Sequence, residues 1–179
     1  MNDWNVVATT QEHQYGRARQ LLGKFGQVGA SHFFNVILMK VDDVDVFVAA
    51  LADDIERHPE HGLVLGRVAP AQKTFDFGGA DDFEDLAKRH VLDWLPRVAG
   101  RTFHVRVHRR GFKGELSTPR EERFVDDSIL EATRRAGRPA QMSFEDPDVI
   151  LAIDTVDNRA GMALWERDDL RRLPFLKLD

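Results

Sequence analysis

The sequence predicts an α/β protein (α+β in its arrangement) made of two domains, over residues 1–79 and 80–179. Two observations predict this class. Short apolar runs alternate along the chain with amphipathic patterns of helical period. The run DVILAIDTV, residues 148–156, is almost entirely apolar, which is typical of a central strand buried on both faces. The stretch GGADD at residues 78–82 interrupts the alternation and marks the expected boundary.

The first domain begins with a short strand in DWNVVATT, residues 3–10. Apolar or aromatic residues then recur at helical spacing at positions 15, 18, 22 and 25, and Gly26 ends this helix. The glycines of GKFGQVG at residues 23–29 lack the spacing of a nucleotide-binding loop. We therefore interpret this stretch as a helix stop followed by a turn.

The remainder of the first domain predicts a strand, a helix and a strand. SHFFNVILMKV, residues 31–41, predicts one long strand. Apolar positions over residues 44–55 follow the pattern of an amphipathic helix, which a proline and a glycine end. LVLGRV at 63–68 is the next strand, and KTFDF at 73–77 predicts another. This order predicts a small sheet covered on one face by two helices, an N-terminal ferredoxin-like domain.

The second domain opens with a helix over residues 81–94, for which Asp81 and Glu84 predict a capping box. The next element is FHVRVHRR, residues 103–110, a strand with histidine or arginine at alternate positions.

A further helix follows this strand and begins at Thr118, the expected N-cap, with Pro119 at the first helical position. Glu121 is expected to close the capping box of this helix. After the central strand, the turn DNRAG leads into MALWER at residues 162–167, which predicts a hairpin. Strand, helix and strand predict a right-handed parallel crossover, so the sheet of this domain is expected to be mixed.

The composition limits the class of protein. With 42% hydrophobic and 31% charged residues, the chain is expected to be soluble and globular. It has no cysteine, which excludes disulfide bonds, thiolate zinc sites and a cysteine nucleophile. The first ten residues lack the features of a signal peptide, and the apolar stretch SHFFNVILM is about half the length of a membrane span. We therefore expect a cytoplasmic protein that does not contact membranes.

Charge is distributed unevenly along the chain. The formal net charge is −5, yet residues 101–138 hold 10 Lys and Arg against 6 Asp and Glu. A surface that binds a polyanion needs such a local excess of cations. The alternative is a solvated strand face beside a helix with ion pairs such as Glu131 and Arg135. The asymmetry favours the anion-binding interpretation.

The alternation of the strand at 103–110 predicts two different faces. Phe103, Val105 and Val107 are expected to face the core. The opposite face is expected to carry cationic or imidazole side chains, namely His104, Arg106, His108 and Arg110. Two glycines allow a tight turn after the strand, which would bring three further cations near its end, namely Lys113, Arg120 and Arg123.

The sequence contains no recognisable catalytic motif. It has no P-loop, no nucleophile elbow and no dinucleotide-binding motif. His104 and His108 share a strand face, but two histidines without a third ligand are a weak metal signal. We expect no metal and no cofactor. The tryptophans lie in apolar patterns typical of a core, and no surface aromatic array is evident.

Three motifs together resemble those of a known family. They are RVHRRG at 106–111, REER at 120–123 and EDPDVILAI at 145–153. In this order they resemble a THUMP domain, the RNA-binding module of tRNA-modifying proteins. The preceding segment resembles the ferredoxin-like domain that often accompanies it. The two resemblances cover nearly the whole chain, which is most similar to stand-alone THUMP proteins that serve as tRNA-binding adaptors for a cytidine acetyltransferase.

The resemblance implies a surface that holds the acceptor stem and 3′ end of tRNA. The RNA-binding residues it implies are Arg106, Arg109, Arg110, Lys113, Arg120 and Arg123. Asp146-Pro147-Asp148 are expected to be structural, since Pro147 pre-sets the entry to a buried strand and a carboxylate there would repel phosphate. Most THUMP proteins also carry a catalytic domain, for which 179 residues leave no room. The expected function is a non-catalytic adaptor that works with a tRNA-modifying enzyme in trans.

Two alternatives remain open. The chain could be a small enzyme that modifies RNA or a nucleotide through an unrecognised site, or a protein-interaction module whose basic patch meets an acidic partner. Under the leading hypothesis we expect tRNA to bind far more tightly than DNA. Arg17 and Arg19, which lie in the acidic first half, are expected to contribute less to RNA binding.

Overall fold

The computed structural model describes residues 1–178, which divide into two compact units. Unit 1 comprises residues 1–72 together with 172–177, and unit 2 comprises residues 73–171 and Leu178. Each unit has its own sheet, one of four strands and one of five, so the α/β class is confirmed. No helix formed by the described residues combines the length and the apolar character that a bilayer span requires.

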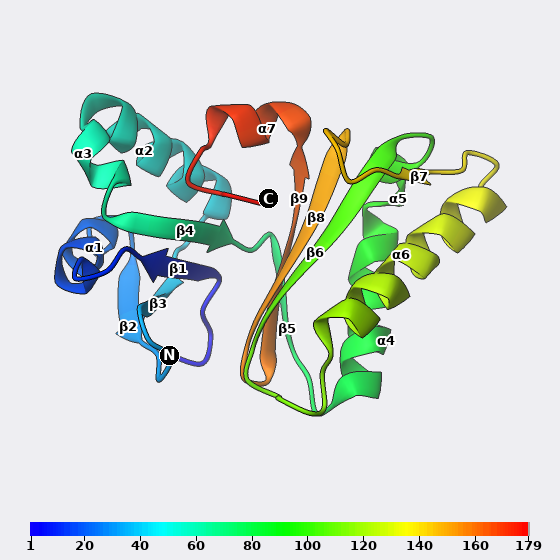
Figure 1. The fold of residues 1–179 in the computed structure, drawn as a ribbon, viewed down its shortest axis with the longest axis horizontal. Helices are drawn as coiled ribbons and strands as arrows, with labels where there is room; N and C mark the ends of the chain where they lie inside the picture. Colours follow the sequence, from blue (N-terminus) through cyan, green and yellow to red (C-terminus); the bar gives the residue numbers. More distant parts are fainter. Residues whose placement is uncertain (179) are drawn as a thin grey trace. The chain divides into compact units, whose positions relative to one another are not determined.

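Unit 1 has the ferredoxin-like element order (Figure 1). Its elements are β1 (Val6–Thr10), α1 (Tyr15–Leu22), β2 (Gln27–Ala30), β3 (Val36–Lys40), α2 (Val44–Arg57), α3 (Pro59–Gly62) and β4 (Leu65–Pro70). The strand order is β2-β3-β1-β4, and all three pairings are antiparallel. The expected ferredoxin-like domain is therefore confirmed, and residues 1–72 form one strand more than the sequence pattern predicted within them.

The additional strand, β2, corrects the prediction of a single long strand over residues 31–41. Residues 31–35 form the turn of a β2–β3 hairpin, in which the Ser31 hydroxyl donates to the Val36 carbonyl oxygen at 3.2 Å. Asn35 closes the turn with a φ of 56°. Gly26 permits the close approach of β2 to β3, because a Cβ there would lie 2.6 Å from the Lys40 carbonyl oxygen. The stretch 23–29, interpreted from the sequence as a helix stop and a turn, therefore also contains the first residues of β2.

Unit 2 is built around a mixed sheet. Its elements are β5 (Lys73–Asp76), α4 (Ala80–Asp93), α5 (Leu95–Val98), β6 (Thr102–Arg110), α6 (Thr118–Arg135), β7 (Gln141–Met142), β8 (Val149–Val156), β9 (Arg159–Glu166) and α7 (Arg167–Arg172). The strand order is β5-β9-β8-β6-β7. β6 and β8 are parallel and β8 and β9 form the expected hairpin. β8 is central and buried along its whole length, as predicted.

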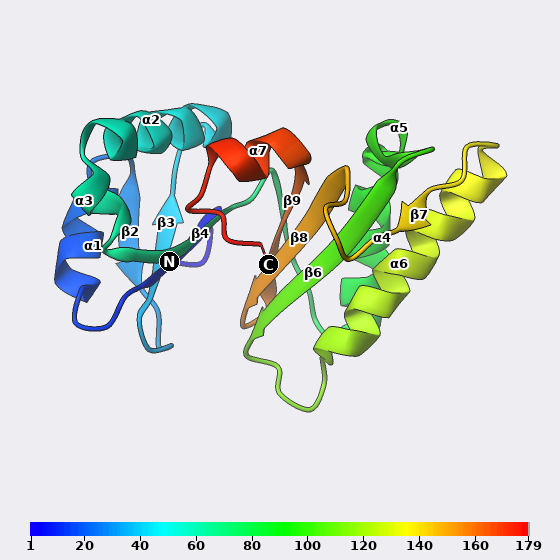
Figure 2. The same ribbon diagram turned by 45° about the horizontal axis from the view of Figure 1, so that its top comes forward.

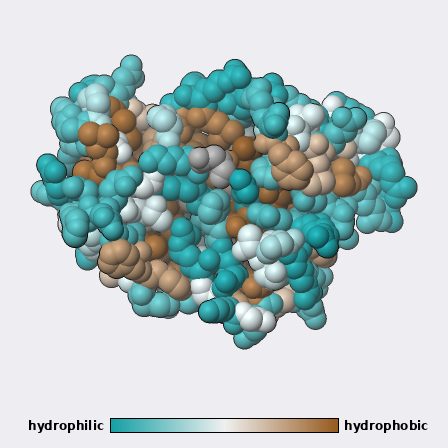
Figure 3. Space-filling view, in the orientation of Figure 1, coloured by the Kyte–Doolittle hydropathy of each residue, from teal (hydrophilic) through white to brown (hydrophobic). Residues whose placement is uncertain are grey.

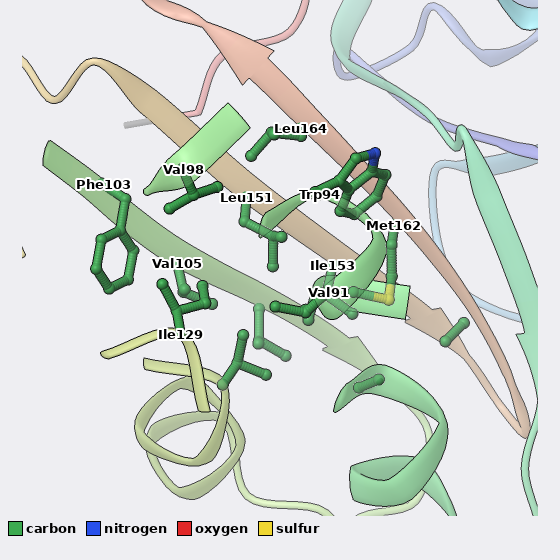
Figure 4. Packing of buried hydrophobic residues seen from close by; sticks show 14 of the residues in the cluster. Val91, Trp94, Val98, Phe103, Val105, Ile129, Leu151, Ile153, Met162 and Leu164 are labelled. Carbon is green, nitrogen blue, oxygen red and sulfur yellow. The ribbon is translucent and has the colours of Figure 1, made fainter. Parts of the chain in front are cut away.

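Helices α4 and α6 lie side by side on one face of this sheet (Figures 1 and 2). Between the helices and the sheet lies the main hydrophobic core, shown in Figure 4. Phe103 and Val105 of β6 contribute to this core together with Leu151 and Ile153 of β8. The inward face predicted for β6 is therefore confirmed.

The units divide at a different place from the expected boundary between residues 79 and 80. β5 pairs with β9, Lys73 opposite Met162, so residues 73–79 belong to the second sheet. Residues 172–177 lie in unit 1, where the Phe175 carbonyl oxygen accepts a hydrogen bond from the Val68 N–H at 2.8 Å. β4 is at the edge of its sheet and pairs with β1 on one side. The bond to Phe175 uses a backbone group on the other side, where none of the described strands pairs with β4.

The start of α4 also differs from the prediction. The N-cap is Gly79, and no side chain caps the helix. The Asp82 carboxylate instead accepts a hydrogen bond from the Gly78 N–H at 2.8 Å, which orders the turn before the helix. Asp81 therefore does not cap α4, because the helix begins one residue before it.

Candidate nucleic-acid interface

The face of β6 opposite the helices is less exposed than the sequence pattern suggested. His104 is 8% exposed, and its ring lies 5.0 Å from the ring of Phe144. Burial lowers the pKa of His104, and the Arg106 guanidinium lowers it further. At neutral pH this histidine therefore adds no positive charge to the surface.

Arg110 uses its charge inside the fold. Its guanidinium lies 3.1 Å from the Asp154 carboxylate of β8, and the two side chains are 17% and 6% exposed. Arg110, which the alternation of the strand placed on the expected cationic face, is therefore largely buried and paired. A buried carboxylate needs a compensating cation, and reversal of the charge at Arg110 would place two negative charges side by side in a largely buried position.

Arg106 and Arg109 lie on different faces of β6, because successive side chains of a strand alternate. Arg106 shares the face of Arg110 and is half-buried. Arg109 is on the face covered by the helices, close to the end of the strand. Its guanidinium donates a hydrogen bond to the Gly111 carbonyl oxygen. The six predicted residues therefore do not form one face.

The turn after β6 presents Lys113 to solvent. Gly111 has a φ of 87°, a conformation that residues with a Cβ rarely adopt. Phe112 anchors the turn, because its ring lies 5.1 Å from that of Phe77 in the core. Leu116 is buried at the other end of the turn. Lys113 lies between these two anchors and is exposed.

The start of α6 does not form the predicted capping box. Ser117 is the N-cap, Thr118 is the first helical residue, and no side chain caps the helix. Glu121 lies in the first turn of the helix, but its side chain is buried beside Glu84 of α4. Burial raises the pKa of Glu121 to about 7, and the Glu84 carboxylate contributes to this rise.

Arg120 and Arg123 differ in how available their charges are. Arg120 Nε donates to Glu84 Oε1 at 3.1 Å, and a guanidinium nitrogen lies 4.0 Å from Asp81. Its side chain is nevertheless 57% exposed. Arg123 is exposed, and within residues 1–178 it forms no ion pair. The charge of Arg123 is therefore more accessible to a ligand than that of Arg120.

Carboxylates interrupt the cationic surface between β6 and α6. Glu122 accepts a hydrogen bond from the Val107 N–H at 2.9 Å. One helical turn later, burial raises the pKa of Asp126 to about 7, and the neighbouring carboxylates of Glu122 and Asp127 raise it too. Carboxyl groups therefore lie among the cations beside the edge of β6.

Two further arginines were counted in the basic segment of the sequence but not assigned to the site. Arg134 and Arg138 are exposed, and neither forms an ion pair with the described residues. Arg134 follows Arg123 by three helical turns, so both lie on one face of α6, roughly 16 Å apart. The recurrence of arginine at this spacing is the sequence signal that could have identified Arg134.

Asp148 has the structural surroundings expected for the segment 146–148. Its carboxylate accepts hydrogen bonds from the N–H and the hydroxyl of Thr102, at 2.9 and 3.0 Å. These bonds lower its pKa. Arg167 forms ion pairs with both Asp146 and Asp148. The acidic groups thus hold the loop before β8 in place.

The surface contains aromatic groups that the sequence pattern did not reveal. Phe34 of unit 1 and Phe144 of unit 2 are 86% and 75% exposed. The face seen in Figure 3 is mainly hydrophilic, with hydrophobic groups at several places. The three tryptophans are buried, as expected. Residues 1–178 contain no group of three or more potential ligands arranged to hold a metal ion.

No protein-family model matches the chain, and no curated protein matches it. Several solved structures share its fold. PH1313 from Pyrococcus horikoshii matches with a TM-score of 0.60 and 11% identity over 90% of this chain. TrmN from Thermus thermophilus matches with a TM-score of 0.60 and 17% identity over 89%. A 4-thiouridine synthetase, solved in complex with RNA and ATP, matches with a TM-score of 0.53 and 14% identity over 90%.

These structures are longer than the chain, which covers 54%, 44% and 41% of them respectively. At such identities the matches show a common fold and no more. The shared region nevertheless includes both units, because about nine tenths of this chain takes part in each match.

Proposed function

We propose that this chain is a THUMP-type RNA-binding protein that holds the acceptor stem and 3′ end of tRNA for a separate tRNA-modifying enzyme, such as a cytidine acetyltransferase. The observation that carries the proposal is the fold shared with a synthetase whose structure was solved with RNA. The local excess of cations in residues 101–138 of an acidic chain supports it.

The proposed interface is centred on Lys113 and Arg123, since both are exposed and neither is in an ion pair within residues 1–178. Arg106, Arg109 and Arg120 contribute from partly covered or partly paired positions. Arg110 acts indirectly, because its pairing with Asp154 supports the strand that bears the others. These side chains offer N–H donors to phosphate oxygens, which positions RNA without reading its bases.

A charge reversal tests the interface. The double variant Lys113→Glu/Arg123→Glu should bind bulk tRNA at least about tenfold more weakly than the wild type, measured by fluorescence anisotropy. The matched control is Lys88→Glu/Arg89→Glu, which makes the same change of charge at two exposed positions of α4. The control should retain most of the affinity. Equal losses in the two variants would overturn the proposed interface, and circular dichroism verifies that both fold.

A second candidate is an RNA-modifying enzyme. It is favoured by other structures with this fold, namely a predicted N6-adenine-specific DNA methylase from Listeria monocytogenes and a putative methyltransferase complexed with SAH. Incubation of the protein with bulk tRNA, with and without a methyl donor, separates the two candidates. Newly modified nucleosides in the digested tRNA would favour the enzyme, and unchanged nucleosides with retained binding would favour the adaptor.

A further inference from the structure

Unit 1 contains a pocket of about 350 Å³ that the proposed RNA interface does not use. Helix α1 and the turn after it supply one wall, and α3 with the residues that follow supplies the other. The lining residues are Arg17, Gln20, Leu21, Lys24, Glu60, His61 and Val64. A volume of this order accommodates a small organic ligand of mononucleotide size.

Two permanent cations line this pocket without partners. Arg17 and Lys24 form no hydrogen bond and no ion pair through their side chains within residues 1–178. Both lie in a half of the chain in which acidic residues predominate. Glu60 is the one carboxylate of the lining, and it lies 3.6 Å from His58 Nδ1. The pocket therefore offers unpaired positive charge to an anionic group.

His61 is held in a defined orientation at the same pocket. Its Nδ1 lies 2.6 Å from Asp54 Oδ2 of α2. An ionised carboxylate only accepts hydrogen bonds, so Nδ1 carries the proton of this bond. Nε2 has no hydrogen-bond partner among the described residues. A carboxylate that orients a histidine while its second nitrogen stays available is an arrangement suited to binding a ligand.

The remaining lining residues define the kind of ligand. Leu21 and Val64 are buried and provide apolar wall against which a ribose or a base can pack. The Gln20 amide, which has no partner within residues 1–178, can both donate to and accept from a hydroxyl group or a base edge.

From this arrangement we infer that unit 1 has a nucleotide site, in which Arg17 and Lys24 hold a phosphate group and His61 Nε2 accepts a hydrogen bond from a hydroxyl or amino group of the same ligand. The phosphate belongs either to a free mononucleotide or to an RNA chain. The inference goes beyond the proposed interface of unit 2 and does not depend on it, because every residue of the pocket is in unit 1.

A titration of the full chain with 5′-AMP, adenosine and inorganic phosphate, followed by NMR of the backbone amides, tests the site. AMP should shift amide signals around the pocket, and adenosine should bind at least about tenfold more weakly, because it lacks the phosphate. Arg17→Ala/Lys24→Ala should reduce AMP binding by a similar factor. The control Arg19→Ala should not, since Arg19 is exposed on α1 but does not line the pocket.

The source of the phosphate is decided by a competition between AMP and a short single-stranded RNA. Tighter binding of the RNA would support the site and identify it as a backbone contact, and tighter binding of AMP would support it as a free-nucleotide site. Equal binding of AMP and adenosine, or equal losses in the pocket variant and in Arg19→Ala, would overturn the inference. Loss of tRNA binding through Lys113 and Arg123 would leave these results unchanged, so the two proposals fail separately.

Discussion

Glu121 shows at the scale of one residue how the fold changes an ionisation. Its side chain projects from α6 and is buried beside Glu84 of α4. Its pKa is raised from 4.5 to about 7, mainly by burial and in addition by the Glu84 carboxylate. At pH values between 4.5 and about 7, Glu121 keeps its proton in the folded chain and has released it in the unfolded chain. The contribution of Glu121 to the free energy of unfolding is therefore complete below pH 4.5 and falls as the pH rises to about 7.

Replacement of Glu121 by glutamine should remove this dependence, because the amide keeps the shape of a protonated carboxyl group and cannot ionise. At pH 8 we expect Glu121→Gln to be more stable than the wild type by on the order of 2 kcal/mol. Urea unfolding at several values between pH 5 and pH 8 measures the difference. Glu115→Gln, at an exposed position in the preceding turn, serves as the control and should leave the pH profile unchanged. A wild-type profile for Glu121→Gln would show that the carboxyl group is not protonated in the fold.

The turn between β6 and α6 shows how a short element depends on its surroundings. Gly111 and Gly114 both have positive φ, 87° and 91°. A Cβ at Gly111 would lie 2.8 Å from Asp157 Oδ1 and 3.0 Å from its Cα, whereas nothing lies within 4 Å of a Cβ at Gly114. Both positions impose backbone strain on any other residue, but only Gly111 also faces a clash with the backbone of the β8–β9 turn.

We therefore expect Gly111→Ala to lower the free energy of unfolding by about 2–4 kcal/mol and Gly114→Ala by about 1 kcal/mol. The two variants control for each other, because the chemical change is the same and both glycines lie in one turn. Denaturant unfolding of both measures the difference. Equal costs would mean that the turn moves away from Asp157 without penalty.

For the whole molecule, the distribution of charge predicts how RNA binding responds to salt. The basic segment has four exposed cations that form no ion pair within residues 1–178, namely Lys113 and Arg123 at the centre of the proposed interface, and Arg134 and Arg138 outside it. If each meets one phosphate, the logarithm of the tRNA affinity should fall with the logarithm of salt concentration with a slope of about −3. The variant Lys113→Glu/Arg123→Glu should have a slope of about −1.5 or shallower, because two of the contacts are lost.

The same measurements distinguish specific from nonspecific binding. Under the proposed function, tRNA trimmed of its 3′ terminal nucleotides should bind more weakly than intact tRNA, and duplex DNA of equal length more weakly still. Binding should be general across tRNAs, because phosphate contacts carry no direct information about sequence. Equal affinity for the three nucleic acids would leave only nonspecific attraction between charges.

The sequence by itself determined the class of fold and most of its elements. The parallel pair of β6 and β8 and the inward face of β6 follow from periodicity and from apolar runs, which are local properties. It missed the β2–β3 hairpin, because the apolar stretch 31–41 hides a turn made by Ser31 and Asn35. It also predicted where cations concentrate, since net charge can be counted without knowledge of the fold.

Only the tertiary structure decided which of these cations are available. Arg110 neutralises Asp154, a residue 44 positions away, while Arg123 stays unpaired among the described residues. Arg17 and Arg19 are two positions apart, yet only Arg17 lines a pocket, because α1 turns Arg19 to a different side. Pairing and burial depend on segments that meet through folding, and their positions in the chain do not reveal such meetings. For this reason the pattern of charges identified a basic segment, and the packing of the chain determined which side chains can reach a ligand.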